Sequence, residues 1–175
     1  MSATLITGSE LYKSFREHLT RRPEELGFFL ASYDAGLRRL ELHTWRPIAP
    51  DGFESQNDFH LELRDEVRAD VIKWAWDNDA CVVEAHSHQP DEPASFSPSD
   101  IWGLDEWVPR VWWRLRGRPY GAIVIAGGTF DALAWIDGAQ APEQVEELRV
   151  DGEAHLPTRR TLARLPKIRE LGRDV

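Results

Sequence analysis

The chain has 175 residues, 42% of them hydrophobic and 29% charged, a composition typical of one folded domain. Lys and Arg number 21 against 30 Asp and Glu, and the net charge of -9 disfavours a nucleic-acid partner, because phosphate binding depends on clustered cations. No apolar segment approaches the roughly 20 residues that span a bilayer, and the N-terminus lacks the features of a secretory signal. We therefore expect no membrane association and a cytoplasmic location.

The acidic residues are concentrated in the middle of the chain. Residues 51–105 contain 14 Asp and Glu and 3 Lys and Arg, whereas residues 159–175 contain 6 basic and 2 acidic residues. A solvated acidic face and a basic tail account for most of these charges, although carboxylates gathered in one segment are also typical of a cation site. Cys81 has no second cysteine to pair with. This excludes disulfides and thiolate-rich metal clusters within the chain, and we expect Cys81 to be a small core residue.

Two helices and a hairpin are predicted in the first half of the chain. Ser9 precedes apolar residues at helical spacing, which predicts a capped amphipathic helix that Pro23 closes. Residues 26–33 and 37–45 are predicted to pair as a hairpin, because they flank a short Gly-containing turn. Apolar positions between residues 65 and 78 predict the second helix.

The next segment is predicted to be a buried strand followed by a helix. Residues 80–85, ACVVEA, are few, apolar and β-branched, and they lead directly into His86. A helix should begin at Ser97, with Pro98 in its first position, and Pro109 should break or restart it.

The last predicted elements are a second hairpin, residues 120–126 and 129–136, and an edge strand within residues 145–150. The alternation of helices, hairpins and strands predicts an α/β fold in which helices sandwich a mixed sheet. We expect a single domain over residues 1–151, followed by a basic C-terminal tail at residues 152–175 that could pack on it.

A candidate metal site lies between the predicted strand and the helix that follows it. Side chains two apart on a strand point the same way, so His86 and His88 can present two imidazoles to one point. Asp100, in the first turn of the next helix, can add a carboxylate. Two histidines and one carboxylate suit catalytic zinc, which keeps three protein ligands and a fourth position open to water.

Each part of this cluster also has a structural explanation. An H-x-H pair occurs by chance, and Ser97 with Asp100 forms the Ser-x-x-Asp pattern of a helix capping box. The two histidines, the serine and the aspartate all fall between residues 86 and 100, however, on a strand–loop–helix that can bring them together. This coincidence favours a functional site.

The same residues resemble the signature of the JAB/JAMM metalloproteases, the MPN-domain family, in which an upstream Glu precedes H-S-H and S-x-x-D. The matching segments are EELGFFLA at residues 24–31 and VVEAHSHQPDEPASFSPSD at residues 82–100. The spacer from His88 to Ser97 holds eight residues, where the family usually has seven. The resemblance covers roughly residues 11–136 and implies a JAB/MPN-like, cytidine-deaminase-like fold, in a compact, bacterial-type member.

The resemblance assigns roles to five residues. His86, His88 and Asp100 match the ligands of one Zn²⁺, and Ser97 matches the serine that stabilises the developing oxyanion. Glu24, three residues before a glycine, matches the general base.

Two further glutamates compete for the role of the base. Glu25 adjoins Glu24 and is not excluded by the sequence, although a solvated carboxylate is the favoured interpretation. Glu84 lies two residues before His86 and should share its face of the strand, so spacing alone would make it a ligand or the base. Under the resemblance it is instead a partner of a ligating imidazole.

The resemblance implies a zinc-dependent peptidase or isopeptidase that cleaves after the C-terminal tail of a ubiquitin or ubiquitin-like protein. Bacterial relatives occur beside proteins that resemble ubiquitin-activating and ubiquitin-conjugating enzymes, some of them in antiphage defence. Other relatives process ubiquitin-like sulfur carriers, which is the first alternative. The second alternative is a catalytically silent MPN scaffold. A zinc deaminase, which needs cysteine ligands and an H-x-E signature, does not fit the sequence.

Overall fold

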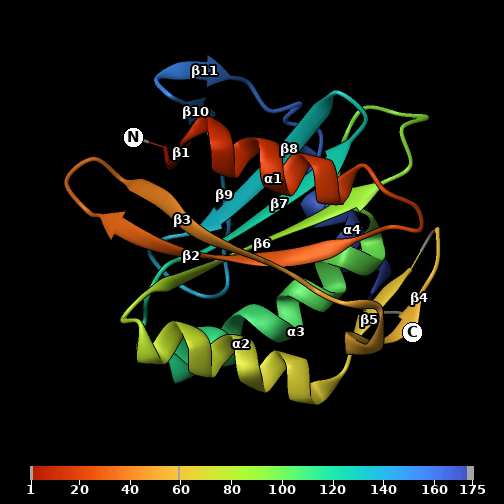
Figure 1. Ribbon diagram of the computed structural model, residues 1–175, viewed down its shortest axis with the longest axis horizontal. Coiled ribbons are helices and arrows are strands. Elements are labelled where there is room, and N and C mark those ends of the chain that lie inside the picture. Colours follow the sequence, from red (N-terminus) through yellow and green to blue (C-terminus); the bar gives the residue numbers. More distant parts are fainter. Residues whose placement is uncertain (1, 59, 173–175) are drawn as a thin grey trace.

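The computed structural model describes residues 2–58 and 60–172, and in these residues a curled, nine-stranded mixed sheet forms the centre of the molecule (Figure 1). Helices cover both of its faces. The helices are α1 (Ser9–Leu19), α2 (Asp65–Asp77), α3 (Pro98–Arg114) and α4 (Leu165–Leu171). The strands of this sheet are β1 (Thr4–Thr7), β2 (Leu26–Asp34), β3 (Arg39–Pro47), β6 (Cys81–His88), β7 (Tyr120–Ala126), β8 (Thr129–Trp135), β9 (Glu143–Gln144), β10 (Glu147–Val150) and β11 (Glu153–His155).

The strand order is β11-β10-β1-β3-β2-β6-β7-β8-β9. Strand β1 runs parallel to both β3 and β10, and β6 runs parallel to β7, while the other neighbouring pairs are antiparallel. A separate hairpin of β4 (Phe53–Gln56) and β5 (Leu61–Leu63) precedes α2. The predicted mixed α/β architecture is therefore confirmed. None of the helices in the described residues is long and apolar enough to cross a membrane.

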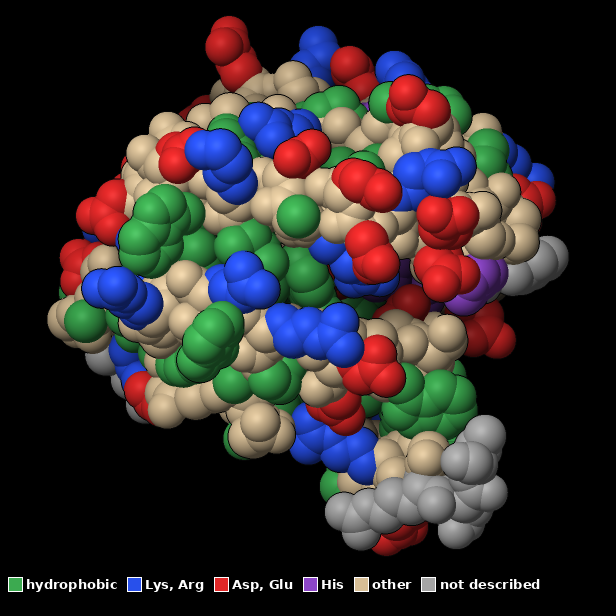
Figure 2. Space-filling model, turned by 90° about the horizontal axis from the view of Figure 1, so that it is seen from below, with side chains coloured by type: hydrophobic (Ala, Val, Ile, Leu, Met, Phe, Trp, Pro, Cys, Tyr) green, Lys and Arg blue, Asp and Glu red, His purple; other side chains and the backbone are tan. Residues whose placement is uncertain are grey.

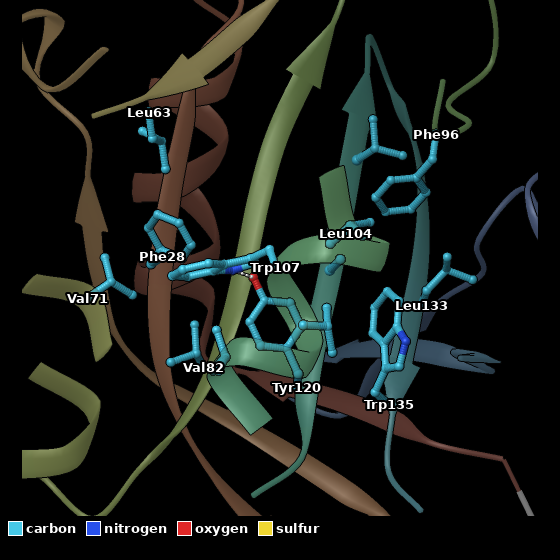
Figure 3. Close-up of a cluster of buried hydrophobic side chains, with 14 of the residues drawn as sticks. Phe28, Leu63, Val71, Val82, Phe96, Leu104, Trp107, Tyr120, Leu133 and Trp135 are labelled. Carbon is cyan, nitrogen blue, oxygen red and sulfur yellow. Dashed lines mark hydrogen bonds between the residues drawn. The ribbon is translucent and has the colours of Figure 1, made fainter. Parts of the chain in front are cut away.

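The central strands are almost continuously apolar because both of their faces are covered. On β2, Phe28 packs into a core beneath α2 and α3, whereas its neighbour Phe29 packs into a second core beneath α1. Figure 3 shows the first of these cores, in which Trp107 of α3 donates a hydrogen bond of 2.8 Å to the hydroxyl of Tyr120 on β7. Cys81 is buried in the second core, as expected.

Helix α3 runs unbroken through Pro109, so the predicted break at this proline is wrong. The helix buries Leu104, Trp107, Val108 and Val111 against the sheet. This packing offsets the backbone hydrogen bond that a proline removes from a helix.

The predicted edge strand is also wrong in its position. Strand β10 lies inside the sheet, between β11 and β1. These two short neighbours, which pair with β10 on either side, were not indicated by the sequence. Helix α1 has Gly8 at its N-cap, and Ser9, the predicted cap, is its first residue.

The C-terminal segment packs on the rest of the fold through β11 and α4. Strand β11 pairs with β10, and α4 buries Leu165 and Ile168 in the core that contains α3. The exposed ring of Trp102 on α3 donates a hydrogen bond of 3.2 Å to the carbonyl of Ile168. The predicted tail, residues 152–175, ends in residues 173–175, which lie outside the described residues.

Candidate metal centre

Strand β6 supplies the two histidines. Val82, Glu84, His86 and His88 alternate with residues that face α1, so they point toward the α2–α3 side of the sheet. His86 is buried, with 4% of its surface exposed, and His88 lies nearer the surface at the end of the strand. Their Nε2 atoms are 3.2 Å apart, so both imidazoles are directed to one point.

Helix α3 supplies the carboxylate. Asp100 Oδ2 lies 3.3 Å from Nε2 of His86 and 3.0 Å from Nε2 of His88. The same residue closes a capping box with Ser97, the N-cap of the helix. The cap therefore orients the carboxylate toward the histidines, and His86, His88 and Asp100 lie close enough together to bind a metal ion.

The pairing of β2 with β6 carries Glu24 to this group. Leu26 is opposite His86 in the antiparallel register, so Glu24, two residues earlier, comes level with His88. Glu24 is 7% exposed and lines a cavity together with His86, Ser97 and Asp100. The segment is held by Ser87, the residue between the two histidines.

Ser87 is hydrogen-bonded to the residue after Glu24 through its backbone and its side chain. The N–H of Glu25 donates to Ser87 Oγ at 2.9 Å, and the N–H of Ser87 donates to the carbonyl of Glu25 at 3.0 Å. Gln56, from the β4–β5 hairpin, also donates to the carbonyl of Glu24 at 3.0 Å. The central residue of the H-S-H segment thus fixes the backbone beside Glu24.

Glu25 occupies a different environment, and the expectation that it is solvated is wrong. It is buried, its carboxylate lies 3.3 Å from Nε2 of His18, and it accepts a hydrogen bond of 3.1 Å from Gln56. Glu25 is absent from the residues that line the cavity beside Asp100. The structure therefore separates the two adjacent glutamates, and only Glu24 faces the candidate metal centre.

The carboxylates and histidines of the site shift one another's pKa values. Burial raises the pKa of Glu24 to about 7. The positive charge of His86 acts to lower this pKa, and the negative charges of Asp100 and Asp58 act to raise it. Burial by itself would lower the pKa of His86, but the carboxylates of Asp100, Glu84 and Glu24 raise it above its ordinary value. Burial likewise opposes ionisation of Asp100, yet the two histidines hold the pKa of this residue well below its ordinary value.

Glu84 lines the same cavity but points its carboxylate at the core. It accepts a hydrogen bond of 2.5 Å from the hydroxyl of Tyr120, which in turn accepts the N–H of Trp107. Burial raises the pKa of Glu84, with the positive charges of His86 and Arg68 acting in the opposite direction. Glu84 is thus part of a buried polar network behind the candidate metal centre.

The cavity continues away from His86 and Asp100 toward α2 and has a volume of about 110 Å³. Its lining includes His60, Arg68 and Trp107, none of which the sequence indicated as part of a site. Trp107 could have been found, since Asp100 and Trp107 are seven residues apart on α3 and so share one face of the helix. His60 and Arg68 arrive from the β4–β5 hairpin and from α2, and no local spacing connects them to the histidines.

No family model matches this chain, and no curated protein matches it. Among solved structures, it is similar to the solution structure of protein DSY2949 from Desulfitobacterium hafniense, a structural-genomics target. The TM-score is 0.53 at 13% sequence identity, and the match covers 83% of this chain and 93% of that one. At this identity the likeness concerns the α/β fold alone.

Proposed function

We propose that the chain is a zinc-dependent peptidase or isopeptidase of the JAB/JAMM type, with His86, His88 and Asp100 as the zinc ligands. The observation that carries the proposal is the convergence of three ligand atoms beside a buried carboxylate, Glu24, and a serine, Ser97. These are the five residues that match the family's signature.

The spacing of the ligand atoms supports zinc. In a tetrahedral site with zinc–ligand bonds of about 2.0–2.1 Å, neighbouring ligand atoms lie about 3.3–3.4 Å apart. The distances among His86 Nε2, His88 Nε2 and Asp100 Oδ2 are 3.2, 3.3 and 3.0 Å. Three protein ligands of this kind leave a fourth position open, which is typical of catalytic rather than structural zinc.

The remaining residues supply the steps of an amide hydrolysis. Bound zinc would act as a Lewis acid toward the scissile carbonyl. Glu24 accepts a proton from the attacking water as the new C–O bond forms, and it returns a proton to the amine nitrogen as the C–N bond breaks. Burial raises the pKa of Glu24 in the absence of metal, and a nearby zinc ion would act to lower it, which favours the ionised form that a general base needs.

The proposed role of Ser97 is to stabilise the oxyanion. Its Oγ accepts the N–H of Asp100 at 3.1 Å, and a hydroxyl that accepts such a bond keeps its own proton to donate. Ser97 also lines the cavity with Glu24. A donor held at a helix start beside the reacting carbonyl needs no rearrangement as negative charge develops.

As substrate we propose the C-terminal tail of a ubiquitin-like protein, released from a conjugate or from a precursor. Partners would then include proteins that resemble ubiquitin-activating and ubiquitin-conjugating enzymes. Support comes from the match of residues 24–31 and 82–100 to the family's motifs and from the mixed sheet that brings these segments together. A JAB/MPN-like form of this α/β fold is part of the same proposal.

The two adjacent glutamates provide a matched test. The zinc-loaded protein is incubated with ubiquitin-like proteins, including sulfur-carrier types, that carry a C-terminal extension or a lysine conjugate, and cleavage is followed by mass spectrometry. Glu24→Gln should abolish turnover of the substrate that is cleaved, whereas Glu25→Gln should retain it, because only Glu24 faces the metal centre. Zinc binding without turnover of any such fusion would favour the silent scaffold, and equal loss in both variants would contradict the assignment of the base.

A further inference from the structure

A groove of about 1290 Å³ runs between α2 and α3. Figure 2 views this side of the molecule and shows hydrophobic side chains interspersed with Lys and Arg on it. Trp76 and Trp113, which line the groove, are 45% and 75% exposed. Large exposed tryptophans are unusual on a surface without a partner, and aromatic residues with arginine are enriched where proteins bind one another.

The groove is positively charged although the chain as a whole carries a charge of -9. Only two acidic residues, Asp65 and Asp77, line it, and Asp77 is paired with Lys73 at 2.5 Å. Four arginines line it without an ion-pair partner among the described residues. These are Arg68, Arg110, Arg114 and Arg116.

Each tryptophan of the groove has an arginine over its ring. The guanidinium carbons of Arg68, Arg114 and Arg116 lie 5.2, 5.4 and 5.3 Å from the ring centres of Trp107, Trp113 and Trp76, in that order. At these distances each guanidinium lies over the face of its ring, and its N–H groups remain free to bind a carboxylate because none of these arginines has an ion-pair partner among the described residues. The groove therefore presents apolar surface beside N–H groups that can donate hydrogen bonds to a carboxylate.

We infer that the α2–α3 groove docks an acidic, amphipathic segment of the protein whose tail is cleaved. This inference rests on the proposed function. Besides its charge, the groove is continuous with the cavity of the candidate metal centre, because Arg68 and Trp107 line both. A segment with apolar residues on one side and Asp or Glu beside them matches the groove in both respects.

A nucleic-acid strand fits the same groove less well. A strand carries negative charge along its whole length and would be repelled by a chain of net charge -9, whereas a short protein segment meets only the local cations. One face of each tryptophan is also already covered by arginine, which leaves less ring surface for stacked bases.

The test measures binding apart from catalysis. Fluorescence anisotropy compares three labelled probes on the Glu24→Gln protein: an amphipathic helical peptide of about 18 residues with Leu on one face and Glu beside it, the same peptide with Lys in place of Glu, and an oligothymidylate of about 20 nucleotides. The acidic peptide should bind most tightly. Arg114→Glu and Trp113→Ala should each weaken its binding about tenfold or more, as is usual for central interface residues.

The matched control is Lys13→Glu, which changes the charge by the same amount at an exposed position of α1, on the opposite face of the sheet (Figure 1). It should change the affinity less than about twofold. Absence of binding of the acidic peptide, tighter binding of oligothymidylate, or equal losses in Arg114→Glu and Lys13→Glu would each overturn the inference. Because no turnover is measured, the result does not depend on whether the chain is a peptidase.

Discussion

Ser97 and Asp100 hold each other through two reciprocal hydrogen bonds. The N–H of Ser97 donates to Asp100 Oδ2 at 2.7 Å, and the N–H of Asp100 donates to Ser97 Oγ at 3.1 Å. The same Oδ2 faces Nε2 of His86 and His88. The Ser-x-x-Asp pattern is therefore both a capping box and part of the candidate metal centre, and its structural and functional interpretations are not alternatives.

Substitution of Ser97 separates these two roles. Ser97→Ala should lower the free energy of unfolding by about 1 kcal/mol through loss of the cap, whereas Ser97→Gly should lower it by only a few tenths. Both variants lack the hydroxyl, so each should reduce kcat by about 100-fold or more. Denaturant unfolding and steady-state kinetics on the identified substrate check this. Near-normal turnover in Ser97→Gly would remove the serine from the mechanism.

The raised pKa of Glu24 predicts that ionisation of this residue lowers the free energy of unfolding of the metal-free protein. Its value of about 7 exceeds the ordinary 4.5, so the folded protein holds this proton more tightly than the unfolded chain. The cost of ionising buried Glu24 is therefore absent below about pH 4.5 and is fully present above about pH 7. Glu24→Gln should gain stability relative to the natural protein over this range, by about 3 kcal/mol.

Urea unfolding at several pH values between about 5 and 8, after removal of metal, measures this difference. Glu17→Gln, which removes an exposed carboxylate on α1, is the matched control for the loss of one carboxylate. A constant difference between Glu24→Gln and the natural protein across the range would show that burial does not raise the pKa of Glu24.

The glycine three residues after Glu24 is required by packing. A Cβ at Gly27 would lie 2.3 Å from the ring of Trp45 and 2.8 Å from the carbonyl oxygen of Arg46. Gly27→Ala should therefore lower stability by about 1–3 kcal/mol, equivalent to a fall in Tm of about 3–10 °C. Gly103→Ala is the control. Its Cβ on α3 would meet no atom within 4 Å, so Tm should stay the same or rise. Equal Tm values for both variants would contradict this account.

The elements that could be predicted from the sequence are those specified by local patterns. A strand ending in His86-Ser87-His88 and a helix starting at Ser97 depend on neighbouring residues, and both occur in the structure. Strand β1 could not be predicted, because four residues of mixed character form a strand only between β3 and β10. Helix α3 continues through Pro109 for a similar reason, since burial of one face outweighs a local preference.

The same distinction applies to the candidate site. The three candidate ligands, His86, His88 and Asp100, lie within 15 residues, so the geometry of a strand, a loop and a helix predicts that their side chains lie close together. The choice of Glu24 over Glu25 and Glu84 came from resemblance, because the register between β2 and β6 joins residues about 60 positions apart and has no local signature. The structure supplies that register.

Zinc content is the measurement that bears most directly on the central claim. After exposure to Zn²⁺ and exhaustive dialysis, elemental analysis should find about one zinc per natural chain and nearly none in His88→Ala or Asp100→Asn, since each removes one of three ligands. His43→Ala, at an exposed histidine bonded to Ser32, should keep full zinc. Circular dichroism establishes that the variants are folded. Stoichiometric zinc in both ligand variants, or no zinc in the natural protein, would contradict the assignment of the metal centre.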